Sequence, residues 1–90
     1  MRVARRFLIS GHVQGVGFRY FAQDAAAREG ITGLVRNLDD GRVEAIAEGE
    51  AAAMERFERA LHRGPSHARV NDVDSESIVP NGRYSGFLVG

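Results

Sequence analysis

Hydrophobic residues recur along this chain at two spacings, and glycine-rich points separate one spacing from the other. Residues 2–10 predict a strand that ends at Ser10-Gly11. From Phe18 the spacing becomes helical, and one face collects the side chains of Phe18, Phe21, Ala22, Ala25 and Ala26. Glu29-Gly30 ends this predicted helix, because glycine commonly follows a helix C-terminus.

Two further strands are predicted in the middle of the chain. They cover residues 31–38 and 42–48, and Asp39-Asp40-Gly41 between them is a strong hairpin signal. Because successive side chains of a strand point to opposite faces, Glu44 and Glu48 lie opposite an apolar face. That apolar face consists of Val43, Ala45 and Ala47.

A second helix and a fourth strand follow. Residues 50–63 predict the helix, which Gly64-Pro65 ends, and its apolar stripe is Ala53, Met54, Phe57, Ala60 and Leu61. Residues 68–78 predict the strand. Its apolar parity shifts between Val70 and Val73, so we expect a β-bulge there.

The order of these elements predicts the fold class. Pro80-Asn81-Gly82 forms a turn, and residues 84–89 could add a last strand. The order βαββαβ is typical of a ferredoxin-like, two-layer α+β sandwich, in which two helices cover one face of an antiparallel sheet. Residues 1–90 fit a single domain. Function must come from a site, because this architecture hosts many unrelated activities.

Two missing residue types narrow the chemistry. The chain has no cysteine, which excludes disulfides, thiolate metal sites and cysteine nucleophiles. All twelve basic residues are arginine, so Schiff-base chemistry and a P-loop lysine are excluded as well. A bound anion must therefore be held by arginine, by backbone N–H groups or by histidine.

Charge and hydropathy argue against a nucleic-acid binder and against a membrane-spanning protein. The net charge is zero, which argues against a general nucleic-acid binder, and no apolar run approaches the roughly 18 residues needed to cross a bilayer. We therefore expect a cytoplasmic protein, and a monomer on grounds of size. Four arginines (Arg2, Arg5, Arg6 and Arg19) precede the first acidic residue, Asp24. They indicate either a solvated face or a local positive field that attracts a small anion.

The segment from Gly11 to Arg19, GHVQGVGFR, joins a strand end to a helix N-terminus. Several backbone N–H groups lack helical partners at that point, and successive glycines allow a loop to curl until its amides converge on an anion. The alternative is a tight turn whose glycines only permit close packing. Arg19 favours the anion site, because a cation in the first helical turn opposes the helix dipole unless a bound phosphate compensates it.

Asn37 is the second residue of interest. It lies near a strand end, just before the predicted hairpin, where its side chain could simply cap the turn. A carboxamide also offers both a donor and an acceptor, so it can orient a water molecule without titrating.

Together these segments resemble the acylphosphatase family. Residues 11–19 look like its first signature, and GLVRN at 33–37 with DGRVE at 40–44 and Glu48-Gly49 resembles its second. Gly64-Pro65 followed by Ala68-Arg69-Val70 also matches the family pattern. Leu34 departs from it, because relatives more often carry tryptophan there, and this affects local packing rather than chemistry. The chain stops at Gly90, so it could lack an end-strand residue found in relatives.

The resemblance implies hydrolysis of acyl phosphates without a metal or other cofactor. It makes Arg19 the phosphate-binding arginine, Asn37 the water-positioning asparagine, and the loop His12, Val13, Gln14, Gly15 and Val16 the phosphate cradle. The chemistry is consistent with this, because the carboxylate leaving group, whose acid has a pKa of about 4 to 5, departs without a general acid. The incoming water's proton would pass to a phosphoryl oxygen of the substrate, as the family resemblance suggests.

Three other readings stay open. An RNA-recognition domain on this fold would need stacking aromatics on its central strands, and residues 42–48 have none. A small-ligand sensor, or another anion-binding protein without turnover, is harder to separate from an enzyme. The chain could also be a phosphate-binding domain whose larger partner performs the reaction. The histidines His12, His62 and His67 show no metal-ligand spacing.

Overall fold

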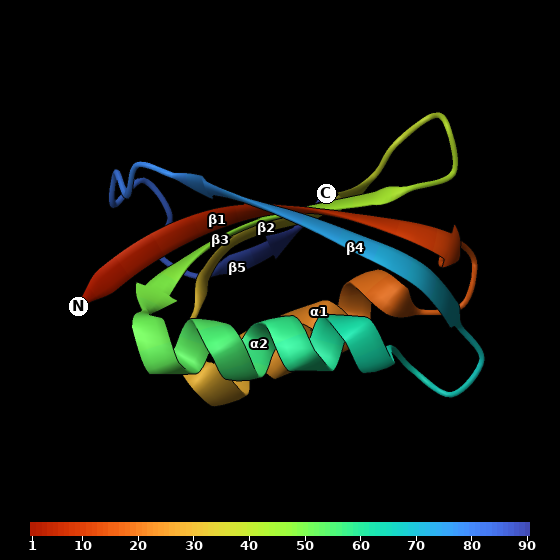
Figure 1. Cartoon of the computed structure of the whole chain (residues 1–90), viewed down its shortest axis with the longest axis horizontal. Helices are drawn as coiled ribbons and strands as arrows, with labels where there is room; N and C mark the ends of the chain where they lie inside the picture. Colours follow the sequence, from red (N-terminus) through yellow and green to blue (C-terminus); the bar gives the residue numbers. More distant parts are fainter.

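The computed structural model describes residues 1–90 and confirms the predicted order of elements. The elements are β1 (Arg2–His12), α1 (Phe18–Glu29), β2 (Thr32–Asn37), β3 (Val43–Glu50), α2 (Ala51–Arg63), β4 (Arg69–Ile78) and β5 (Phe87–Val89). The strands form one sheet in the order β4-β1-β3-β2-β5, and both helices lie on the same side of it (Figure 1). This is the expected ferredoxin-like α+β sandwich.

The expected antiparallel sheet is formed by β1 to β4, and the possible last strand, for which no direction was predicted, joins it in parallel. β1 runs antiparallel to β3 and β4, and β2 runs antiparallel to β3, but β5 runs parallel to β2. The chain leaves β4 at one edge of the sheet and crosses to the other edge before it forms β5, so β5 enters beside β2 in the same direction. β5 is also shorter than predicted, because only Phe87–Val89 pair with β2.

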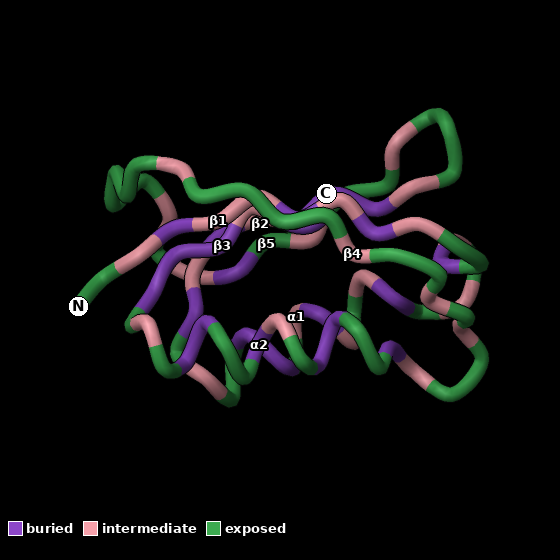
Figure 2. The backbone as a smooth tube through the Cα atoms, in the orientation of Figure 1, coloured by how far each residue is buried: buried purple, intermediate pink, exposed green.

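The core lies between the sheet and the helices, where Figure 2 shows most of the buried backbone. The predicted stripe of α2 is buried in full, and that of α1 is buried except for Phe21, which is only partly covered. Phe57 of α2 packs edge-on against Phe7 of β1, with ring centroids 6.0 Å apart, and against Phe87 of β5, at 5.6 Å. No helix combines the length and the apolarity needed to cross a bilayer.

The predicted bulge is present in β4 and shapes the end of β1. The pairing of β1 with β4 shifts between Ser10 and Gly11, which leaves Asn71 as the extra residue. Gly11 has φ +130°, and a Cβ on it would lie 2.1 Å from the carbonyl oxygen of Arg69, so only glycine fits. The bulge therefore determines how the chain leaves β1 toward residues 13–17.

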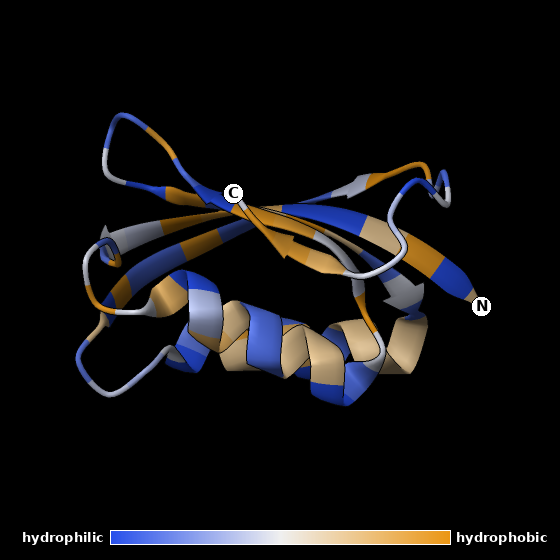
Figure 3. Ribbon diagram, turned by 180° about the vertical axis from the view of Figure 1, so that it is seen from behind, coloured by the Kyte–Doolittle hydropathy of each residue, from blue (hydrophilic) through white to orange (hydrophobic).

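Along the strands hydrophobic and hydrophilic residues alternate (Figure 3), and the face away from the helices carries ion pairs. Glu44 accepts hydrogen bonds from Arg6 Nε at 2.6 Å and from Arg36 Nε at 2.7 Å. Burial works against the ionised form of this carboxyl, but both guanidinium groups favour it and together hold the pKa of Glu44 below its ordinary value.

Glu48 on the same face anchors the connection between β4 and β5. Its carboxylate accepts the backbone N–H groups of Asn81, at 2.8 Å, and Gly82, at 3.0 Å, and also pairs with Arg2 at 3.1 Å. The hydrogen bond from Asn81 contributes most to a lowered pKa of Glu48, burial opposes it, and Arg2 adds to it.

Candidate functional site

The glycine-rich loop leaves a run of backbone amides without acceptors. Within the protein, no amide of residues 13–17 donates a hydrogen bond, and those of residues 18–20 lack helical partners because the first bond of α1 runs from Phe21 N–H to the Gly17 carbonyl. Gly17 precedes the helix in the left-handed conformation, at φ 77° and ψ 18°, and the first turn carries no acidic side chain. Free N–H groups at a helix N-terminus favour a bound anion.

Arg19 adds a positive charge beside these amides. Its half-buried side chain pairs with no aspartate or glutamate side chain, and Nη1 donates a hydrogen bond to the main-chain oxygen of Gly90, the last residue of the chain. A guanidinium has five N–H donors, so most of the fork stays available to a ligand. No acidic side chain therefore neutralises the charge of Arg19.

Asn37 ends β2 on the helix-covered face of the sheet, opposite Val43 of β3. Asn37 is exposed, and its side chain makes no hydrogen bond within the protein. The free carboxamide can therefore donate to or accept from a ligand or a water molecule.

Arg19 and Asn37 share one pocket of about 80 Å³ with the loop. Its walls come from Val13, Gly15, Gly17, Phe18, Arg19, Tyr20 and Asn37. Gly17, Phe18 and Tyr20 were not predicted as site residues, although Gly17 and Phe18 belong to the same motif and Tyr20 directly follows it. Tyr20, with 61% of its surface exposed, forms an aromatic part of the lining. The pocket therefore joins free amides, a guanidinium without an acidic side-chain partner and a free carboxamide.

Three residues of the predicted cradle do not line this pocket. His12 is an exposed residue at the end of β1, paired with Arg69 of β4. Gln14 turns its side chain to the β2–β3 hairpin, where Nε2 donates to the carbonyl oxygens of Leu38 at 2.8 Å and Arg42 at 3.0 Å. Val16 is half-buried and packs against the core. Gln14 and Val16 contribute only their backbone N–H groups, not their side chains, to the set of amides without acceptors.

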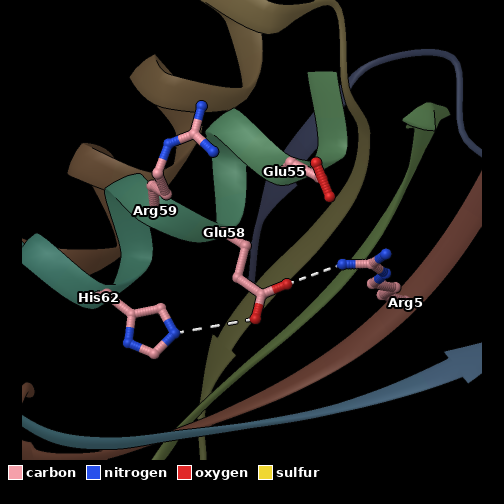
Figure 4. A pocket seen from close by; sticks show the side chains of 5 residues that line it. All are labelled: Arg5, Glu55, Glu58, Arg59 and His62. Carbon is pink, nitrogen blue, oxygen red and sulfur yellow. Dashed lines mark hydrogen bonds and ion pairs between the residues drawn. The ribbon is translucent and has the colours of Figure 1, made fainter. Parts of the chain in front are cut away.

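The clustered arginines do not form a shared positive field at the pocket. Arg2 and Arg6 pair with Glu48 and Glu44 on the open face of the sheet. Arg5 lies in a second depression, of about 280 Å³, with Glu55, Glu58, Arg59 and His62 of α2 (Figure 4). There Glu58 engages both Arg5, at 2.8 Å, and His62, at 3.8 Å. Arg19 is thus the one arginine of this group in the candidate site.

No group of three or more histidine, cysteine, aspartate or glutamate side chains is arranged to hold a metal ion. The site is built instead from backbone N–H groups, one guanidinium and one carboxamide, which are ligands for an anion.

Comparison with known proteins shows to which family the chain belongs. The family model for acylphosphatases matches residues 5–89. The chain belongs to the acylphosphatase family. An acylphosphatase from Anaeromyxobacter dehalogenans is 50% identical over 88 residues, which is 98% of this chain and 95% of that protein. One from Rubrobacter xylanophilus is 50% identical over 84 residues, 93% of this chain and 76% of that protein.

The same family provides a structural match. The crystal structure of acylphosphatase from Bacillus subtilis superposes with a TM-score of 0.94 at 36% identity, and the match covers 98% of both chains. The acylphosphatase fold therefore extends over nearly the whole chain, including β5, which the sequence pattern indicated least strongly.

Proposed function

We propose that the protein hydrolyses the carboxyl-phosphate bond of acyl phosphates and releases a carboxylate and inorganic phosphate. The observation that supports this most directly is the pocket in which the free amides, Arg19 and Asn37 meet. In this proposal the amides of residues 13–17 and Arg19 hold the phosphoryl group, and Asn37 orients the attacking water.

These groups match the demands of the reaction. Phosphoryl transfer passes through a loose transition state, so the protein contributes mainly positioning and stabilisation of charge. The amides and the guanidinium supply that charge stabilisation, and Arg19 can contact two phosphoryl oxygens at once. The leaving carboxylate needs no proton, and the water's proton can pass to a phosphoryl oxygen. No step of this scheme requires a metal ion or another cofactor.

The proposal includes three finer points. The enzyme acts on small acyl phosphates rather than on nucleic acid, works as a monomer and resides in the cytoplasm. The small pocket and the zero net charge support the first point. Size-exclusion chromatography and cell fractionation test the other two.

The direct test is phosphate release from benzoyl phosphate and acetyl phosphate by the purified protein in EDTA. We expect saturable hydrolysis of both compounds. Saturable phosphate binding without hydrolysis would instead identify an anion-binding protein that lacks turnover.

A further inference from the structure

Gln14 carries the hydrogen bonds that connect the phosphate loop to its surroundings. Nε2 donates to the carbonyl oxygen of Leu38 at 2.8 Å and to that of Arg42 at 3.0 Å. Apart from the bond between Phe21 N–H and the Gly17 carbonyl, these are the only hydrogen bonds that residues 13–17 make. The side-chain carboxamide of Gln14 thus donates both of its N–H groups to one neighbouring element.

That element is the hairpin that carries Asn37. Leu38 directly follows Asn37, and Leu38 N–H donates to the Arg42 carbonyl at 2.8 Å, so the two carbonyls reached by Gln14 close the neck of the hairpin. The candidate pocket has one side from the loop and the start of α1 and another side from Asn37. Gln14 is the hydrogen-bonded link between those two sides.

We propose that the side chain of Gln14 is a positioning residue, which holds Asn37 in register with the phosphate loop. The inference rests on the proposed function, in which the loop binds the phosphoryl group and Asn37 orients water. Attack requires the water to approach phosphorus along a narrow range of directions, and a shift of about 1 Å can cost about 10²-fold in rate. The amides that bind phosphate are on the loop itself, so loss of the link affects turnover more than phosphate binding.

The residue type suits this task. A carboxamide of this length offers two donors to two carbonyl oxygens without adding a charge, whereas a glutamate would place a carboxylate against them. Methionine keeps a similar length and removes both donors. Asparagine keeps both donors on a stem that is one methylene shorter.

The experiment is a double-mutant cycle with Gln14→Met and Asn37→Ala, which measures kcat for benzoyl phosphate and the inhibition constant of inorganic phosphate. We expect Gln14→Met to lower kcat by about tenfold to 10²-fold, and to leave phosphate inhibition within about twofold. In the Asn37→Ala background, the same substitution should have little further effect on kcat. Gln14→Asn, which keeps both donors, should fold and give an intermediate kcat.

Asp40→Ala is the matched control. Asp40 accepts two hydrogen bonds from Arg42 in the same hairpin, from its backbone N–H at 3.1 Å and from Nε at 2.8 Å, and neither involves Gln14. This variant should lose stability and keep wild-type kcat. Equal losses of kcat in both Asn37 backgrounds, or a parallel weakening of phosphate inhibition, would overturn the inference and leave the proposed function standing. Wild-type protein that hydrolyses no acyl phosphate would overturn the proposed function itself.

Discussion

Arg19 donates a hydrogen bond to the main-chain oxygen of Gly90, so the residue that follows the last strand orients the guanidinium beside the glycine-rich loop. This contact uses one donor of the fork, and no aspartate or glutamate side chain takes part in it. The start of α1 and the end of β5, which are far apart in sequence, thus meet at the candidate site.

Arg19 is expected to provide most of the side-chain charge that stabilises the transition state. We predict that Arg19→Ala lowers kcat/KM for benzoyl phosphate by about 10²–10³-fold. Arg19→Lys should also lose most activity, because an ammonium group cannot reproduce a two-point contact. Arg28→Ala, in the last turn of the same helix and without an ion pair, is the control and should retain activity. Wild-type turnover in both Arg19 variants would contradict the assigned role.

Asn37 is expected to act on the water and not on the phosphate. Asn37→Ala should reduce kcat by about 10²-fold, because a positioned polar group is lost from the transition state. Inhibition by inorganic phosphate should be largely intact, since the amides and Arg19 are unchanged. Steady-state kinetics with and without phosphate measure both quantities. A large loss of phosphate affinity with unchanged kcat would assign Asn37 to phosphate binding instead.

Substitutions at Gly17 test the backbone geometry of the loop. The φ angle of Gly17 is +77°, and no atom lies within 4 Å of a Cβ built on it, so a side chain there meets only backbone strain. We predict that Gly17→Ala costs about 1–2 kcal/mol of unfolding free energy, measured by urea denaturation, and weakens phosphate inhibition. Gly17→Asn should recover most of both losses, because asparagine tolerates the left-handed conformation better than alanine does. Equal damage by both substitutions would show that the space, not the backbone conformation, is limiting.

The ionised glutamates of the open face predict how stability depends on pH. The pKa values of Glu44 and Glu48 are lowered in the folded protein, so between the ordinary value of about 4.3 and the lower folded values the unfolded chain binds more protons. Their contribution is therefore present above that ordinary value and is lost as the pH falls through the folded values. Urea unfolding at a series of pH values from 7 to 3 should show this decline.

Glu48→Gln separates this effect from general acid unfolding. The variant keeps the shape of the side chain but loses the charge that Arg2 and the two backbone N–H groups stabilise. It should be less stable than the wild type at pH 7, and its stability should fall less steeply below about pH 5. Parallel pH curves for the two proteins would rule out Glu48 as a contributor.

Much of the fold followed from local patterns. The helical spacing from Phe18, the hairpin signal at Asp39-Asp40-Gly41 and the parity shift beside Val70 each depend on neighbouring residues, and each is confirmed. The parallel pairing of β5 was missed, because it depends on where the chain crosses the sheet, which no local pattern encodes. The anchor of that crossing, Glu48, looked in sequence like an ordinary polar position of a strand.

The site was predicted in its parts rather than in its arrangement. Four of the residues that line the pocket were expected there: Val13, Gly15, Arg19 and Asn37. The side chain of Gln14 was not separated from its backbone amide, because its two acceptors lie in the hairpin and are distant in sequence.

The central claim, that the loop amides and Arg19 hold the phosphoryl group, can be tested by titrating ¹⁵N-labelled protein with inorganic phosphate. We predict saturable shifts of the backbone amide signals of residues 13–20 and of the Arg19 guanidinium signal, with little change at Arg5, Arg59 and His62. Shifts confined to the depression around Arg5, with the loop amides unchanged, would contradict this account.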